Sequence, residues 1–132
     1  MNPLLIDHIG IVVRDISSSL VFYRDILGLP LEGIENNKDY NVDIAFLRCG
    51  ETLVELLQPT GEGSLMTYLE TKGEGVHHLA IRVGSIVEAL ESLKAGNTPL
   101  VDDRPKRGGG GAKIAFLEAV AANNVSIELI ER

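Results

Sequence analysis

Two histidines and two glutamates stand at matching places in the two halves of this chain. His8 and His78 are 70 positions apart, and four apolar residues after His8 recur at the same offset. These residues are Ile11, Val13, Ile16 and Leu20, which recur as Ile81, Val83, Ile86 and Leu90. Glu55 and Glu128 correspond in the same way, three residues out of step. Imidazole nitrogens and carboxylate oxygens together form a ligand set for a metal ion.

The duplication favours this metal hypothesis over a purely structural role. A lone histidine or a lone strand glutamate usually forms hydrogen bonds or faces water, but four such residues at duplicated positions favour one shared site. The set suits zinc, cobalt, nickel, manganese or iron. Four protein ligands leave an octahedral ion with open positions for water or substrate, which favours catalysis over a scaffold role.

The elements that must position these residues follow one order in both halves. In the first half, the β-branched residues 4–13 predict a strand, and apolar residues near the helical period predict a helix that stops at Gly28. In the second half, residues 76–83 predict a strand, and residues 85–95 predict a helix that ends at Gly96.

Further strands complete each half. Residues 42–49 and 51–58 predict a tight hairpin, whereas their counterparts, 112–117 and 124–131, are joined by a longer loop. This loop accounts for the slip of three residues between the glutamates. The glycines of residues 59–75, around a short helix-like piece, predict a connection between the halves.

Strand alternation predicts the face on which each histidine lies. His8 shares its face with Gly10, and His78 shares its face with Ala80, while the apolar residues between them face the helices. Small side chains beside both imidazoles leave the room that a ligand cavity requires. His77 precedes His78 and faces the helix side, so we expect it to pack or form hydrogen bonds and not to bind the metal.

Composition restricts the class of protein. The 132 residues fit one domain, and a net charge of -7 argues against nucleic acid as a partner. No apolar run is long enough to span a membrane, and the amino terminus lacks the features of a leader, so we expect a cytoplasmic protein. The single cysteine, Cys49, lies in an apolar stretch and predicts a buried, inert thiol.

These features resemble the vicinal oxygen chelate superfamily, which includes glyoxalases, bleomycin resistance proteins and extradiol dioxygenases. The segments that carry the resemblance are residues 7–13, 55–59, 75–80, Pro105 with the glycine run, and 114–117. The resemblance implies an α+β fold in which two tandem βαβββ modules form a curved mixed sheet around a metal-binding cavity, with helices outside. The expected single domain is 1–132, with module 1 at about 4–58, a linker at about 59–75 and module 2 at about 76–132.

Within the superfamily, the segments are most similar to the methylmalonyl-CoA epimerases. This resemblance implies the metal ligands His8, Glu55, His78 and Glu128, and a cobalt, zinc, nickel or manganese ion. It also implies an acyl-CoA substrate, a homodimer, and Asp43 and Glu128 as the two bases that act on the proton α to the thioester. Asp43 is one methylene shorter than the glutamate expected there.

Two alternatives remain on the same fold. One is a glyoxalase I-type lyase, which uses a similar set of ligands, and the other is a small-molecule binding or resistance protein without catalysis. Residues 118–121 read Glu-Ala-Val-Ala where the epimerases carry His-Pro-Lys and a polar residue, so this loop departs from the pattern that seats the epimerase substrate. The run Gly108–Gly111 could bring backbone amides near an anion or serve only as a flexible connection.

Overall fold

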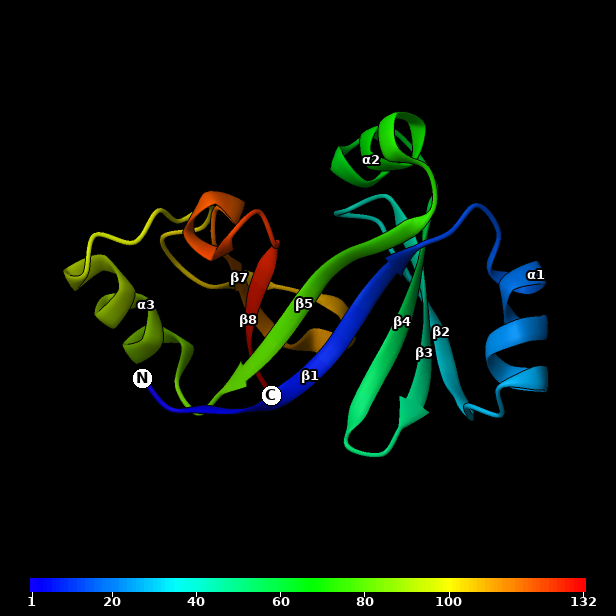
Figure 1. Ribbon diagram of the computed structural model, residues 1–132, viewed down its shortest axis with the longest axis horizontal. Coiled ribbons are helices and arrows are strands. Elements are labelled where there is room, and N and C mark those ends of the chain that lie inside the picture. Colours follow the sequence, from blue (N-terminus) through cyan, green and yellow to red (C-terminus); the bar gives the residue numbers. More distant parts are fainter. The chain divides into compact units, whose positions relative to one another are not determined.

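The computed structural model describes residues 1–132 and shows one order of elements twice (Figure 1). The first repeat consists of β1 (Pro3–Val12), α1 (Ile16–Leu20) with its π-helical continuation η1 (Val21–Ile26), β2 (Leu31–Asn37), β3 (Val42–Cys49) and β4 (Thr52–Pro59). α2 (Ser64–Lys72) connects the repeats. The second repeat consists of β5 (Gly75–Val83), α3 (Ile86–Ala95), β6 (Lys106–Arg107), η2 (Gly109–Gly111), β7 (Lys113–Phe116), η3 (Ala119–Ala122) and β8 (Ile127–Glu131). The predicted βαβββ order is confirmed in both halves.

Local sequence signals set the helix ends. The Asp15 carboxylate accepts a hydrogen bond from the Ser18 amide at 2.8 Å and caps the start of α1, because the first amides of a helix lack partners within it. Gly28, with φ of +85°, ends the helical segment as predicted. In the second repeat Ser85 caps α3, and Asn97 adopts the left-handed conformation after its last turn.

The chain forms two compact units, which divide β1 between His8 and Ile9. Unit 1 comprises residues 1–8 and 78–132, and unit 2 comprises residues 9–77. In unit 1, β5 runs parallel to β8, whereas β8, β7 and β6 are antiparallel neighbours. In unit 2, β2, β3 and β4 form an antiparallel set. The strand pairing is therefore mixed, as predicted.

Both units bury apolar side chains on two faces of their strands. On the helix side of unit 1, α3 packs on its strands through Val83, Ile86, Ala89, Leu90, Ala115 and Leu129. The other face of unit 1 carries a smaller cluster of Ala80, Ala112, Ile114 and Ile130. In unit 2, α1 packs on its strands through Val13, Ile16, Leu20, Ala45, Leu47 and Leu56. α3 and α1 thus each cover one strand face of their units, and the opposite face carries the predicted site residues; in unit 2 apolar residues of α2 also pack on that opposite face.

Two local expectations need correction. Cys49 is exposed and not buried, because it ends β3 at the turn of the hairpin instead of lying within the apolar strand. The segment 118–124, expected as a longer loop, contains the short helix η3. No helix of the structure combines the length and apolar character needed to cross a bilayer.

Candidate metal centre

Three of the predicted ligands converge within unit 1. His8 comes from β1, His78 from β5 and Glu128 from β8, and all three side chains are buried. The Nε2 atoms of the two histidines are 3.0 Å apart. The Glu128 carboxylate oxygens lie 3.3 Å from Nε2 of His8 and 3.5 Å from Nε2 of His78. The ligand-type atoms of these residues therefore face one point.

The spacing of these atoms fits a common metal ion. Two ligand atoms about 2.1 Å from one ion lie about 3.0 Å apart at octahedral angles and about 3.4 Å apart at tetrahedral angles. The separations of 3.0, 3.3 and 3.5 Å match this range. Burial also makes an ionised carboxylate costly unless a cation or hydrogen bonds compensate it. The cluster can therefore hold a divalent ion.

Strand register explains why His78 and Glu128 meet. β5 and β8 run parallel with Ala80 beside Glu128, so Glu128 lies next to the residue two positions after His78 on the same face. Ala80 is fully buried, and its methyl group leaves space beside the imidazole, as the sequence predicted. The same alternation places Arg82 on the face of β5 that carries His78, and Arg132 follows directly after the end of β8.

Asp7 is a buried residue next to the cluster that the sequence did not single out. Its carboxylate accepts a hydrogen bond from Nδ1 of His8 at 2.7 Å, and it is also bound by Arg82 and Arg132. Burial opposes ionisation, but the hydrogen bonds from His8, Arg132 and Arg82 outweigh it and hold the pKa of the Asp7 carboxyl well below its usual range. The signal in the sequence was Arg82 four residues after His78 and Arg132 four residues after Glu128.

An aromatic ring and a cation lie next to the cluster. The Phe116 ring packs edge-on against His78, with 5.5 Å between ring centroids. Nζ of Lys106 lies 5.6 Å from the centroid of the same ring and forms an ion pair with Asp102 at 3.2 Å. Together with the apolar cluster of unit 1, Phe116 makes the surroundings of His78 poor in water.

Glu55 is the predicted ligand that lies in unit 2. It is a buried carboxylate on β4, and it pairs across the hairpin with Phe46 of β3. Directly paired residues share a face, so Glu55 lies on the face that also carries Ile44 and Leu57. This is the face opposite to α1, as expected for a residue of the site.

Asp43 lies on the other face of the same hairpin. It pairs with Gln58, whose side-chain oxygen accepts a hydrogen bond from the Ile16 amide at the start of α1 at 2.8 Å. The Asp43 carboxylate itself accepts a hydrogen bond from Asn36 at 2.6 Å. Glu55 pairs with Phe46, which is three residues after Asp43 on β3. Because neighbouring residues of a strand point to opposite faces, Asp43 and Glu55 lie on opposite faces of the hairpin. The register does not support its predicted role as a base.

His77 differs from His78 as the sequence predicted. Its ring is half-buried and packs edge-on against Tyr68 of α2, with 5.0 Å between centroids. Burial, with Lys72 nearby, lowers the pKa of His77 and favours the neutral ring. His77 is a packing residue and takes no part in the cluster.

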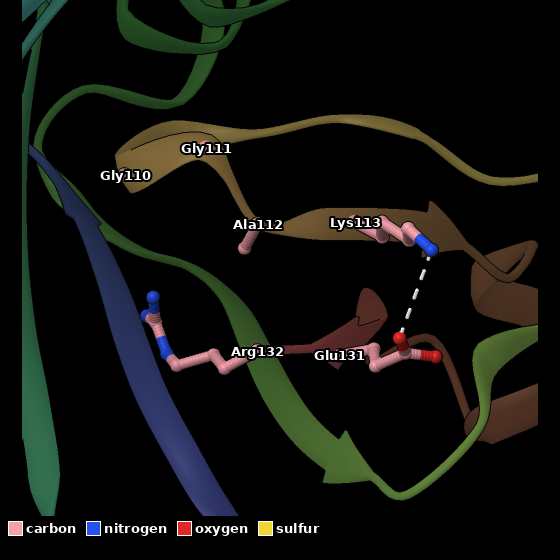
Figure 2. Close-up of a pocket in the computed structure, with 6 residues that line it drawn as sticks. All are labelled: Gly110, Gly111, Ala112, Lys113, Glu131 and Arg132. Atoms are coloured by element: carbon pink, nitrogen blue, oxygen red, sulfur yellow. Dashed lines mark ion pairs between the residues drawn. The ribbon is translucent and has the colours of Figure 1, made fainter.

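The glycine run borders a small pocket of about 250 Å³. Figure 2 shows its lining residues, which are Gly110, Gly111, Ala112, Lys113, Glu131 and Arg132. Lys113 and Glu131 form an ion pair across it at 3.8 Å. Both signs of charge therefore line this pocket.

Residues 7–116 match the model of the Glyoxalase/Bleomycin resistance protein/Dioxygenase superfamily. The chain belongs to this superfamily. The match includes His8, Glu55 and His78 but ends before Glu128. The structure of methylmalonyl-CoA epimerase in complex with methylmalonyl-CoA and NH4+ is similar to this chain, with a TM-score of 0.93 and 31% identity. The superposition covers 98% of this chain and 95% of that one, and it confirms the predicted fold class.

Sequence comparison gives relatives of two kinds. The uncharacterized protein YqjC of Bacillus subtilis is 37% identical over 132 residues, which cover 99% of this chain and 93% of that protein. The ethylmalonyl-CoA/methylmalonyl-CoA epimerase of Cereibacter sphaeroides is 33% identical, with 94% of this chain and 95% of that protein covered. The chain is thus similar, along nearly its whole length, both to an epimerase and to an uncharacterized protein.

Proposed function

We propose that this protein is a metal-dependent isomerase of the methylmalonyl-CoA epimerase type, which removes the proton α to a thioester carbonyl. The observation that carries the proposal is the convergence of His8, His78 and Glu128 with the spacing of neighbouring ligands around one ion. The similarity to epimerases over nearly the whole chain supports an acyl-CoA substrate.

In this proposal Glu55 completes the set of ligands for a cobalt, zinc, nickel or manganese ion. A buried carboxylate between apolar strand neighbours needs a compensating charge or hydrogen bonds, and a divalent ion supplies such a charge. When bound, the ion would stabilise the negative charge of the enolate that forms on loss of the α-proton.

Glu128 is the proposed base. One of its carboxylate oxygens takes the α-proton, and the electron pair of the broken C–H bond moves into the enolate. A proton returned to the α-carbon by the same oxygen regenerates the starting epimer, so Glu128 alone accounts for proton exchange but not for inversion. Phe116 and the apolar cluster around Ala80 keep the surroundings poor in water, which strengthens the electrostatic interactions made there.

Epimerisation requires a proton donor on the opposite face of the α-carbon as well. The sequence predicted Asp43 for this role, but Asp43 lies on the helix side of its hairpin. On the face of the hairpin that carries Glu55 of β4, the residues of β3 next to Asp43 and Ala45 are Ile44 and Phe46 instead. The stereochemistry of proton exchange therefore distinguishes catalysis by two bases, one on each face of the α-carbon, from catalysis by Glu128 alone.

The experiment measures proton exchange and its stereochemistry together. Protein loaded with cobalt is incubated in deuterium oxide with each epimer of methylmalonyl-CoA, and mass spectrometry with chiral analysis follows deuterium at the α-carbon. We expect exchange that depends on the metal and on Glu128. Inversion of both epimers would support the epimerase-type proposal and indicate two bases, whereas exchange without inversion would reject epimerisation and indicate a single base.

The same preparation tests the lyase alternative. A glyoxalase I-type enzyme would convert the hemithioacetal of methylglyoxal and glutathione and leave the α-proton of methylmalonyl-CoA in place. That outcome would reject the epimerase-type proposal and keep the metal centre. Binding of acyl-CoA without exchange in the cobalt-loaded protein would instead identify a binding protein.

A further inference from the structure

We infer that Asp7 is a positioning residue that fixes the tautomer and orientation of His8, and that Arg82 and Arg132 hold Asp7 in place for this purpose. The inference rests on the proposed metal centre, whose ligand His8 it concerns. It assigns a role to a residue that would not touch the metal or the substrate. Its evidence lies entirely within unit 1.

The two ring nitrogens of His8 face different partners. Nδ1 lies 2.7 Å from Oδ1 of Asp7, and Nε2 faces Nε2 of His78 and the Glu128 carboxylate. A neutral imidazole carries one N–H, and an ionised carboxylate can only accept a hydrogen bond. The proton of neutral His8 is therefore on Nδ1, and the lone pair of Nε2 points into the cluster, where a metal ion requires it.

Two arginines fix the carboxylate that selects this tautomer. Arg132 donates from Nε to Oδ2 and from Nη2 to Oδ1 of Asp7, both at 2.8 Å. Arg82 donates from Nε to Oδ2 at 2.9 Å, and its Nη2 lies 2.8 Å from the same oxygen. With the bond from His8, both oxygens are engaged, so the carboxylate cannot rotate without losing a charge-assisted hydrogen bond. The Asp7 side chain is fully buried, which excludes competing water.

The same contacts connect the three strands that carry the ligands in unit 1. Asp7 precedes His8 on β1, Arg82 follows His78 by four residues on β5, and Arg132 follows Glu128 by four residues. One carboxylate thus fixes β1 against the ends of the two other ligand strands. The ion-pair group defined by Asp7, Arg82 and Arg132 sets both the rotation of the His8 ring and the distance between ligand strands.

A structural role alone would not require any particular tautomer of His8. The proposal predicts that, whenever the His8 ring is neutral, its proton lies on Nδ1 in the hydrogen bond to Asp7. Long-range proton–nitrogen NMR correlations of the wild-type protein measure this directly. His8 found with its proton on Nε2 would overturn the proposal without the use of any variant.

The variant Asp7→Asn tests the consequence for the metal. An amide offers one accepting oxygen in place of two, so either His8 or an arginine loses its partner. We expect the proton of His8 to shift toward Nε2 and cobalt affinity, measured by competition with a chelator, to fall about 10- to 100-fold. Glu32→Gln is the matched control, since Glu32 forms an exposed two-bond pair with Arg48 in unit 2.

The outcomes separate this inference from the proposed function. An Asp7→Asn protein that keeps the Nδ1 proton of His8, or binds cobalt as tightly as the control, would reject the positioning role. A wild-type protein that shows the expected tautomer but takes up no cobalt would reject the metal centre and support the role of Asp7 in orienting His8.

Discussion

At the scale of residues, the duplication of the sequence predicts more of the site than any single motif does. It selects His78 over His77 and pairs Glu128 with Glu55, and the structure brings His8, His78 and Glu128 together. It does not predict Asp7, because alternation alone would direct Asp7 away from the face of His8. The hydrogen bonds of Asp7 join it to its neighbour in sequence and to arginines more than 70 positions away, and their only trace in the sequence is the arginine four residues after each of His78 and Glu128.

Substitution of the two candidate bases should have unequal effects. Glu128→Gln removes the proposed base and should slow deuterium exchange at the α-carbon of methylmalonyl-CoA by about 100-fold or more. Asp43→Asn should leave the rate within about twofold, because Asp43 is hydrogen-bonded to Asn36 on the helix side of its hairpin. A severe loss in Asp43→Asn, with unchanged metal content, would restore Asp43 as a catalytic residue.

At the scale of elements, periodicity and turn residues predict both main helices and the β3–β4 hairpin closely. Asp15, Gly28 and Ser85 mark helix ends at the expected positions because capping is a local interaction. The helix predicted to end at Gly28 includes η1, but its π-helical form was not predicted, and neither was the short helix η3. Strand register, which decides the face of Asp43, depends on long-range pairing.

The glycine run that precedes β7 has one position where space, and not flexibility, requires glycine. A Cβ at Gly108 would lie 2.7 Å and 2.9 Å from side-chain atoms of the buried Ile114. Gly108→Ala should therefore lower the free energy of unfolding by about 1–3 kcal/mol through overpacking. Urea denaturation measures the change, with Gly33→Ala as control because a Cβ there meets nothing within 4 Å. Equal stability of both variants would contradict the close packing at Gly108.

At the scale of the whole molecule, the chain belongs to a superfamily whose members share one fold but have several different activities. Fold and composition therefore leave the reaction open, and the proposed function depends on a few buried side chains. The cytoplasmic location, the homodimer and the boundaries of the modules stay predictions. Light scattering after gel filtration tests the homodimer, which should have twice the 14.3 kDa mass of one chain.

Metal binding should raise the stability of the whole protein. A ligand at 100 times its Kd adds about 2.7 kcal/mol to the free energy of unfolding if it binds only the folded state, and roughly 10 °C to the Tm of a chain of this length. Cobalt should produce this shift in the wild type and in His77→Asn, but not in His78→Ala. A cobalt-dependent shift that survives in His78→Ala would place the ion elsewhere.

The central claim is that one divalent ion binds at His8, His78 and Glu128, with Glu55 as the proposed fourth ligand. Anomalous diffraction from a crystal grown with cobalt tests it most directly. The account predicts one strong peak at about 2.0–2.3 Å from Nε2 of His8, Nε2 of His78 and a carboxylate oxygen each of Glu55 and Glu128. A fully occupied cobalt site away from these residues would contradict the claim. A crystal without any cobalt peak, in which Nε2 of His8 and Nε2 of His78 are still 3.0 Å apart, would also contradict it.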